Sequence, residues 1–163
     1  MEHLAKHDVL TGLHNRNAFF ERFEQSLALA RRHGNQMGLL FIDLDNFKSI
    51  NDFLGHDTGD RILAAVAEKL KVSVRDADTV CRFGGDEFVV LLAEIAQPDH
   101  AYAVADKIRE AAAEPMVVAG RDVSMQLSIG VSVYPDDGVN AEELLKKADS
   151  AMYRVKILNR QSV

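Results

Sequence analysis

The sequence predicts an α+β fold in which helices pack on a mostly antiparallel central sheet. Apolar residues recur at helical spacing in several long segments, shorter apolar runs have the length of strands, and a glycine-rich turn joins two of these runs directly. The expected order is helix, strand, helix, helix, strand, strand, helix, strand and helix. This mixed order, with a hairpin at its centre, indicates the α+β class.

The first half of the chain is expected to contain a long helix, a buried strand and two further helices. The first helix carries apolar residues at helical spacing and ends where Gly34 can serve as its C-cap. The apolar run that follows is typical of a buried strand. The predicted bounds are a turn within residues 8–16, a helix up to about His33, a strand from Met37 to Ile42, a short helix from Phe47 to Phe53 and a longer helix from about Asp57.

The second half is expected to contain a hairpin, a helix, one more strand and a final helix. Apolar residues alternate strictly with polar residues and glycine from Met125 to Val133, which predicts a half-buried strand. Asn140 with Glu143 resembles a helix cap. The predicted bounds are strands from Thr79 to Phe83, from Phe88 to Leu92 and from Met125 to Val133, and helices that begin at Pro98 and after Asn140.

Length, charge and cysteine content limit the classes of protein that fit this chain. Its 163 residues suit one domain with a substantial core. The formal net charge of −6 argues against a nucleic-acid-binding surface, although a few local cations suffice for a nucleotide. The one cysteine, Cys81, excludes an internal disulfide, and no apolar run reaches membrane-spanning length. We therefore expect a cytoplasmic domain without membrane contact of its own, alone or as part of a larger, membrane-bound or multidomain protein.

A first candidate site lies at the end of the first predicted strand. Asp43 and Asp45 are two residues apart on an extended segment, so their carboxylates should point the same way and face open space. Mg²⁺ often takes one or two protein carboxylates together with substrate phosphates. By itself this pattern is more often a solvated strand end.

A second candidate site is the tip of the predicted hairpin. Gly84 and Gly85 precede Asp86 and Glu87 between two apolar strands. The glycines would let a phosphate or another backbone approach closely. A plain turn with acidic residues for solubility is the alternative, but such a turn has no general need for this run of residues.

Several ordered motifs resemble those of the GGDEF family of diguanylate cyclases. The signature itself is matched by residues 84–88, Gly-Gly-Asp-Glu-Phe. The other landmarks occur in residues 8–13, in Asn15 and Arg16, in residues 43–52 and 55–60, and in residues 148–153 with Lys156. Together they span nearly the whole chain, so the resemblance implies a single GGDEF domain over residues 1–163 with its core at about 8–160.

The resemblance implies a ferredoxin-like core similar to the palm of nucleotidyl cyclases. It also implies an enzyme that condenses two GTP molecules into cyclic di-GMP plus two pyrophosphates, in bacterial second-messenger signalling. The implied cofactor is Mg²⁺, with Mn²⁺ as an alternative. Each site would hold one GTP, so a homodimer would be needed for catalysis.

The resemblance also assigns roles to residues around the two candidate sites. Asp43 and Asp86 would hold the metal together with the Leu44 carbonyl, and Glu87 and Lys48 would complete the catalytic residues. A two-metal site stabilises both the attacking and the leaving oxygen of a displacement.

Substrate-binding roles follow from the same resemblance. Asn51 and Asp60 would read guanine, because an ionised carboxylate accepts from the N1–H and N2–H₂ donors of guanine but would face a lone pair on adenine. The phosphates would be bound by Lys48, by Lys156 and Arg160, and by backbone amides near Asn46 and Phe47. Lys156 and Arg160 share one helix face, although a basic helix C-terminus interacting with the helix dipole explains the same spacing.

An inhibitory site for the product is the last implied feature. Arg75 and Asp78 fit the RxxD pattern upstream of the signature, where the family binds cyclic di-GMP away from the catalytic centre. Lys107 or Arg109 would be candidates for a second cation. An ordinary ion pair at a helix end is the alternative explanation.

The chain departs from the family pattern in its last helix, and other functions remain to be compared. Asn159 and Gln161 stand where the family often has glycine and asparagine, which affects the placement of Arg160. One alternative is a non-catalytic GGDEF module that binds GTP or cyclic di-GMP and regulates a neighbouring domain. Others are a dimerisation domain of a two-part enzyme and an unrelated metal-dependent phosphotransferase.

Overall fold

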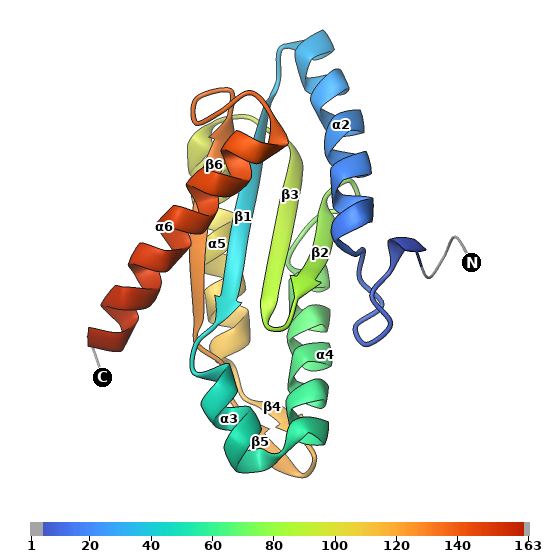
Figure 1. The fold of residues 1–163 in the computed structure, drawn as a ribbon. Coiled ribbons are helices and arrows are strands. Elements are labelled where there is room, and N and C mark those ends of the chain that lie inside the picture. Colours follow the sequence, from blue (N-terminus) through green and yellow to red (C-terminus); the bar gives the residue numbers. More distant parts are fainter. Residues whose placement is uncertain (1–4, 162–163) are drawn as a thin grey trace.

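The computed structural model describes residues 5–161, and its centre is a four-stranded antiparallel sheet in the order β2-β3-β1-β6 (Figure 1). Each neighbouring pair of strands in this sheet is antiparallel, which confirms the predicted fold class. Strand β1 lies between β3 and β6. The strands are β1 (Gln36–Leu44), β2 (Thr79–Gly84), β3 (Glu87–Ile95) and β6 (Leu127–Tyr134).

Helices cover both faces of this sheet and divide the core in two (Figure 1). One face packs against α2 and α6, and the other against α4 and α5, while the short α3 lies beside α4 at one end. The helices are α2 (Arg16–His33), α3 (Phe47–Leu54), α4 (His56–Val72), α5 (Pro98–Ala113) and α6 (Ala141–Gln161).

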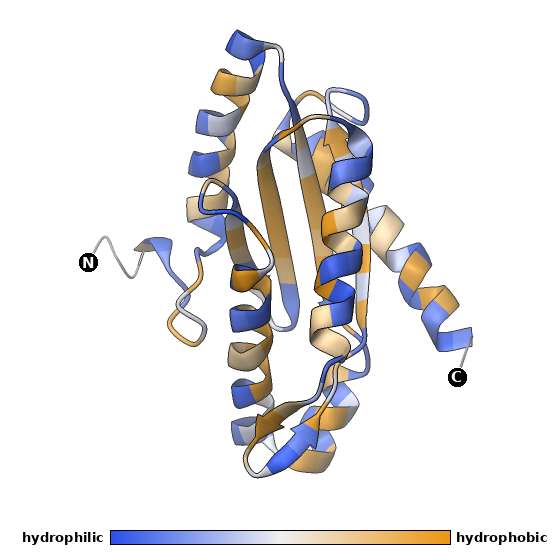
Figure 2. Ribbon diagram, turned by 180° about the vertical axis from the view of Figure 1, so that it is seen from behind, coloured by the Kyte–Doolittle hydropathy of each residue, from blue (hydrophilic) through white to orange (hydrophobic). Residues whose placement is uncertain are grey.

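Strand β1 supplies side chains to both halves of the core. Successive residues of a strand point to opposite faces, so Leu40 and Ile42 join the cluster under α4 and α5, while Leu39 and Phe41 join the cluster under α2 and α6. Figure 2 shows the central strands in the hydrophobic colour, with hydrophilic residues on the outer sides of the helices. Burial on both faces explains why this segment is a continuous apolar run.

The prediction of a half-buried strand from Met125 to Val133 is wrong in two respects. The strand begins at Leu127, and both of its faces are covered, since Ser128 and Ser132 are fully buried. A Cβ at Gly130 would lie 2.0 Å from the Ala148 carbonyl oxygen, so the glycine lets α6 approach the sheet closely. The polar side chains of β6 therefore face a helix rather than solvent.

A small hairpin between α5 and β6 is absent from the sequence prediction. It consists of β4 (Met116–Val118) and β5 (Arg121–Val123), joined by Ala119 and Gly120, which both have positive φ. Two central residues at positive φ are typical of a tight hairpin turn. Strands of three residues are too short for alternation to stand out in the sequence.

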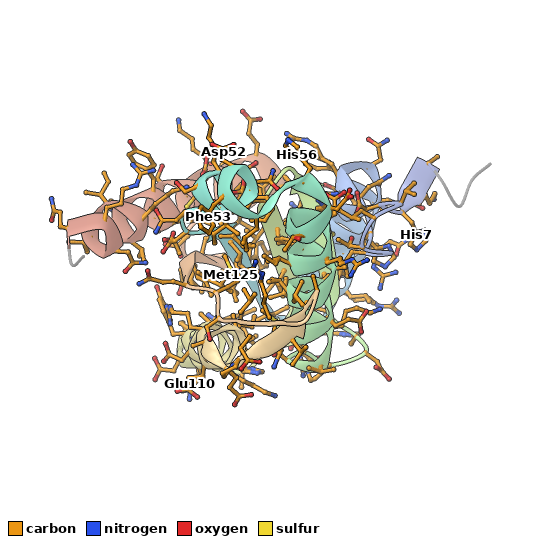
Figure 3. The ribbon with its side chains drawn as sticks, turned by 90° about the horizontal axis from the view of Figure 1, so that it is seen from below. His7, Asp52, Phe53, His56, Glu110 and Met125 are labelled. Atoms are coloured by element: carbon orange, nitrogen blue, oxygen red, sulfur yellow. The ribbon has the colours of Figure 1, made fainter. Side chains whose placement is uncertain are left out.

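The features predicted to form the metal and phosphate sites come together at one end of the sheet. The end of β1, the tip of the β2–β3 hairpin, α3 and the C-terminal part of α6 all lie toward the lower side of Figure 1. Figure 3 views this end from below, with Asp52 and Phe53 on α3 and His56 at the start of α4. None of the helices within residues 5–161 is long and apolar enough to cross a membrane.

Candidate functional site

The register of the central strands joins the two acidic segments. Asp43 on β1 lies directly opposite Glu87 on β3. The Leu44 N–H donates to the Asp86 carbonyl oxygen at 3.3 Å, which ties the end of β1 to the hairpin tip. The structure therefore brings together Asp43, Leu44, Asp86 and Glu87, as the metal-site prediction requires.

The carboxylates at this junction are buried, and they affect one another. Asp43 is only 6% exposed, and its Oδ1 has no hydrogen-bond partner among the described residues. Burial and the adjacent Asp43 raise the pKa of Asp86 from 3.8 to about 6. Burial, Asp43 and Asp149 also raise the pKa of Glu87. Burial and the proximity of the other acids thus disfavour the ionised forms of Asp86 and Glu87.

Lys156 of α6 reaches this cluster, where it forms an ion pair with Asp43 Oδ2. The expectation that Asp43 and Asp45 face open space is wrong, because both side chains contact α6 and are more than nine-tenths buried. Their spacing does make them face the same way. The helix converts an apparent strand end into an enclosed polar site.

The donor set fits a magnesium ion that is completed by substrate. Within residues 5–161 no group of three or more His, Cys, Asp and Glu side chains is arranged as a ready-made metal site. Mg²⁺ does not require one, since it commonly uses one or two carboxylates, waters and phosphate oxygens. Asp43 and Asp86 provide such a pair of carboxylates, and Asp43 Oδ1 has no hydrogen-bond partner among the described residues.

A polar cavity of about 180 Å³ adjoins this junction. It brings together three predicted phosphate ligands, Asn46, Lys156 and Arg160, from segments far apart in the sequence. Asn46 has a left-handed backbone with φ of 59° and directly precedes α3. As in any α-helix, the backbone N–H groups of the first turn of α3 lack intrahelical partners. Phe47 is buried in this turn, whereas Lys48 is exposed and does not line the cavity.

The predicted guanine ligands lie on neighbouring helices. Asn51 on α3 packs so closely on α4 that a Cβ at Gly59 would lie 1.9 Å from Asn51 Oδ1. Asn51 Nδ2 is 2.9 Å from His56 Nδ1, and Asn51 Oδ1 is buried without a hydrogen-bond partner among the described residues. Asp60, next to Gly59, is exposed on α4.

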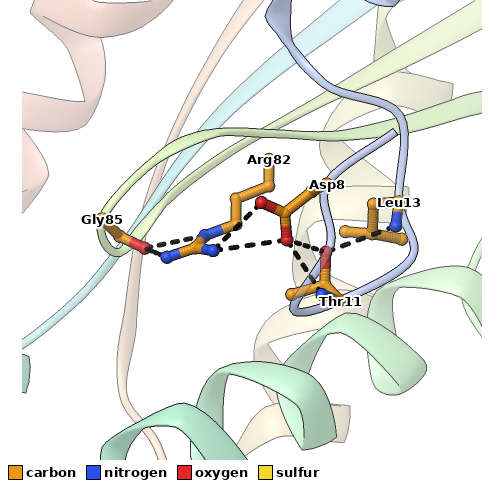
Figure 4. Close-up of polar contacts among 5 residues, drawn as sticks. All are labelled: Asp8, Thr11, Leu13, Arg82 and Gly85. Atoms are coloured by element: carbon orange, nitrogen blue, oxygen red, sulfur yellow. Dashed lines mark hydrogen bonds and ion pairs between the residues drawn. The ribbon is translucent and has the colours of Figure 1, made fainter. Parts of the chain in front are cut away.

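An anchor for the hairpin tip is visible only in the structure (Figure 4). The Arg82 guanidinium donates to the Gly85 carbonyl oxygen at 2.8 and 3.0 Å and forms an ion pair with Asp8 at 3.1 Å. Asp8 also accepts from the backbone N–H and hydroxyl of Thr11. The N-terminal loop is thereby joined to the turn that presents Asp86. Sequence separation hides this contact, although both segments belong to the quoted motifs.

Ser128 and Asn159 also contact the site and were not predicted to do so. Both bind the Asp45 carboxylate, at 2.6 Å and 2.9 Å. The only signal in the sequence is the departure at position 159. Helix α6 continues through this residue to Gln161, so Arg160 is placed by regular helix geometry despite the departure at position 159.

The RxxD segment is a tightly bonded turn. Asp78 is buried and accepts from the backbone N–H groups of Arg75, at 3.0 Å, and of Ala93, at 3.1 Å. The Arg75 guanidinium contacts Asp78 and donates to the Glu94 carbonyl oxygen, while about half of its side chain is exposed. Arg109 lines a different cavity, beside Asn159, so it is not a second cation next to Arg75 in the same chain.

Comparison with known proteins finds relatives in both sequence and structure. The family model described as diguanylate cyclase, GGDEF domain, matches residues 5–162. The chain is 44% identical over 162 residues to the cyclic di-GMP phosphodiesterase NbdA of Pseudomonas aeruginosa, which covers 99% of this chain and 21% of NbdA. It is 44% identical over 158 residues to the diguanylate cyclase TpbB of that species, which covers 96% of this chain and 36% of TpbB.

Structural similarity agrees with the sequence matches. The solved GGDEF domain of TpbB has a TM-score of 0.90 and 42% identity, over 93% of this chain and 89% of that one. The chain spans only about a fifth of the length of NbdA and about a third of that of TpbB. The similarity therefore concerns one domain-sized part of each relative.

Proposed function

Because the chain belongs to the GGDEF family of diguanylate cyclase domains, we propose that it condenses two GTP molecules into cyclic di-GMP. In each half-reaction the 3′ oxygen of one GTP bonds to the α-phosphorus of the other. The bond from that phosphorus to the bridging oxygen breaks, and pyrophosphate leaves. The observation that supports this proposal most directly is the meeting of Asp43 with Asp86 and Glu87 beside a cavity lined by Lys156 and Arg160.

Asp43 and Asp86, with the Leu44 carbonyl, would hold Mg²⁺ or Mn²⁺. Such an ion supplies stabilisation of the negative charge on the attacking and leaving oxygens. With the charge of Asp43 neutralised, Lys156 would exchange its ion pair for the phosphates of GTP. Arg160, which lines the same cavity, would bind them from the next turn of α6, and Lys48 would approach from α3.

Glu87 is suited to take the proton of the 3′-hydroxyl. Burial and neighbouring acids raise its pKa, which makes its carboxylate a stronger proton acceptor. The proton would then pass to solvent or to the departing pyrophosphate. Glu87 lies directly opposite Asp43 on the neighbouring strand. The proposed base, Glu87, and the proposed metal ligand, Asp43, would therefore act on the same part of the substrate.

Asn51 and Asp60 would select guanine over adenine. Asp60 is exposed at the surface of α4, where its carboxylate can accept from the N1–H and N2–H₂ edge. Adenine presents an acceptor at N1, so the carboxylate would lose its partner and its hydration together. We therefore propose GTP rather than ATP as the substrate.

The direct test is incubation of the pure protein with GTP and Mg²⁺, followed by chromatographic separation of the nucleotides. We expect cyclic di-GMP from GTP and no product from ATP. Asp43→Asn and Asp86→Asn should each abolish turnover, whereas Asp122→Asn, an exposed carboxylate on β5, should not. Normal turnover in either site variant would show that the metal assignment is wrong.

A non-catalytic module that regulates a neighbouring domain is the second candidate. The specific observation in its favour is the similarity to NbdA, which is named a phosphodiesterase. Retention of Asp43, Asp86, Glu87, Lys48 and both guanine ligands argues for catalysis. GTP or cyclic di-GMP binding without any turnover at high protein concentration would favour the module.

We also propose that Arg75 forms part of a product-binding site, as the family resemblance implies. Its half-exposed guanidinium can donate to a phosphate or to guanine. Asp78 is already engaged by two backbone N–H groups, so its main role here would be to orient Arg75. Calorimetry with cyclic di-GMP should show binding that Arg75→Ala removes while GTP turnover survives, and equal affinity in both proteins would exclude the site.

A further inference from the structure

A closed ring of hydrogen bonds joins α6 to the end of the sheet. Asn159 Nδ2 donates to Asp45 Oδ2 at 2.9 Å and to Ser128 Oγ at 3.2 Å. Ser128 Oγ in turn donates to Asp45 Oδ1 at 2.6 Å. One helix and the ends of two strands therefore meet in this ring.

Asp45 and Ser128 of this ring are buried, and Asn159 is partly buried, so the loss of a bond in the ring is costly. Asp45 is 7% exposed and Ser128 is fully buried, and the Asp45 N–H is held by the Gln126 carbonyl oxygen at 2.9 Å. Hydrogen bonds to a carboxylate are stronger than neutral ones, and low dielectric strengthens them further. Removing the Asn159 amide would leave a buried carboxylate oxygen without its donor.

The position of the ring relates it to the phosphate cavity. Asn159 lies one helical turn after Lys156 and directly before Arg160, and all three line the cavity of about 180 Å³. Helix α6 is thus attached to the end of β1 at two points, by Lys156 to Asp43 and by Asn159 to Asp45.

These two attachments differ in whether they can persist when substrate binds. The proposed function requires Lys156 to leave Asp43 for the phosphates. The ring uses no residue that the proposed function assigns to metal or substrate. It can therefore hold the helix in place while Lys156 changes partner.

We propose that Asn159 is a positioning residue that acts through Asp45 and Ser128 to present Lys156 and Arg160 to the β- and γ-phosphates of GTP. This inference rests on the proposed function. Glycine, which the resembling family often has at this position, has no side chain to form the ring. The ring therefore depends on the asparagine that this chain has at position 159.

The test compares Asn159→Ala, Asn159→Gly and Ser128→Ala with Gln161→Ala, an exposed amide two residues further along the same helix. Binding of 3′-deoxy-GTP, which lacks the attacking hydroxyl, is measured by calorimetry with Mg²⁺, and GMP serves as the ligand without β- and γ-phosphates. We expect the ring variants to bind the triphosphate about 5- to 20-fold more weakly. GMP affinity should change less than about twofold, and Gln161→Ala should match the wild type.

Two further readouts separate positioning from general loss of structure. In turnover assays, the ring variants should raise KM for GTP more than they lower kcat, because the lost interaction orients the phosphate ligands. Amide hydrogen exchange without nucleotide should be faster in the C-terminal turns of α6 in these variants. Because Asn159→Gly introduces the common family residue, it provides a second variant should Asn159→Ala fold poorly.

Several outcomes would overturn the proposal. Wild-type affinity for 3′-deoxy-GTP in Asn159→Ala and Asn159→Gly would do so, as would equal weakening of 3′-deoxy-GTP and GMP. Failure of the proposed function looks different, because the wild-type protein would then make no cyclic di-GMP from GTP. Binding selectivity and exchange in α6 would still report on the ring in that case.

Discussion

At the scale of single residues, the buried carboxylates where β1 meets the hairpin tip affect the stability of the fold. The pKa of Asp86 is raised from 3.8 to about 6, so the folded protein favours its protonated form. Stability is therefore lost as pH rises through this window, and ionised Asp86 destabilises the metal-free fold at neutral pH. Sites that bind cations commonly carry such unfavourable charge when empty.

We accordingly expect Asp86→Asn to stabilise the metal-free protein at pH 7. The gain should be about 1 kcal/mol, since the half-buried side chain is partly screened by solvent. Near pH 4 the two proteins should have similar stability. Urea denaturation with a chelator at both pH values measures the difference. A variant no more stable than wild type at pH 7 would contradict the raised pKa.

Gly59 determines where Asn51 can lie. The backbone φ of this glycine is not positive, so Gly59→Ala should be tolerated by α4 itself, yet the new Cβ would overlap Asn51 Oδ1. We expect Gly59→Ala to fold and to raise KM for GTP about tenfold or more, as displacing a hydrogen-bonding side chain does. In an Asn51→Ala background the same substitution should have little further effect. Additive effects in this double-mutant cycle would argue against the steric coupling.

At the scale of elements, the N-terminal loop and the β2–β3 hairpin behave as one unit. Burial alone would raise the pKa of Asp8, but hydrogen bonds from Thr11 and the charge of Arg82 lower it below 3.8. The resulting stabilisation is present above that pH and is lost as pH falls through the lowered pKa. The loop thereby fixes the turn that carries Asp86 (Figure 4).

We expect Asp8→Asn to lower the free energy of unfolding at pH 7 by about 1–2 kcal/mol, the usual effect of losing hydrogen bonds to a charged group. The difference from wild type should shrink below about pH 4, where the wild-type carboxyl also becomes protonated. Denaturant unfolding across this pH range checks both statements. A difference that is constant with pH would show that the charge of Asp8 is not responsible.

The close contact between α6 and β6 is a second feature at the scale of elements. A Cβ at Gly130 would meet backbone atoms of Ala148 and Met152 at 2.0 and 2.3 Å, which cannot move without shifting the helix. We expect Gly130→Ala to destabilise the fold by more than about 2 kcal/mol. Gly84→Ala is the control for stability, because its Cβ would meet no atom within 4 Å. Thermal unfolding of the two variants should differ clearly, and similar melting temperatures would contradict the tight packing.

At the scale of the whole molecule, one domain supplies only one of the two GTP sites that the proposed reaction needs. Each site is expected to hold one GTP, so two domains must face each other to join two nucleotides. We expect specific activity to rise with protein concentration in the dilute range, because association limits the reaction there. Progress curves over a hundredfold dilution series measure this. Constant specific activity throughout would indicate a preformed dimer or a different reaction.

Much of this architecture was determined by the sequence alone. Apolar periodicity identified the long helices, because burial of one face imposes a repeat that can be read directly. Short apolar runs and the glycine-rich turn identified the strands of the main sheet. The ordered motifs at residues 43–52 and 84–88 identified the family and the acidic pair. The three-residue strands β4 and β5 were not predicted, since so short a segment shows no repeat.

Only the tertiary structure decided which polar residues become buried partners. Ser128 follows the alternation of an exposed strand face, and Asn159 lies on a helix whose polar residues are mostly exposed. Both enter the site because Gly130 lets α6 pack closely over β6 and the end of β1. Periodicity reports whether a face is apolar, not whether a helix covers a polar one. The contacts that attach α6 to Asp45 and Ser128 therefore depend on the distance between α6 and the sheet, which the packing of the whole domain sets.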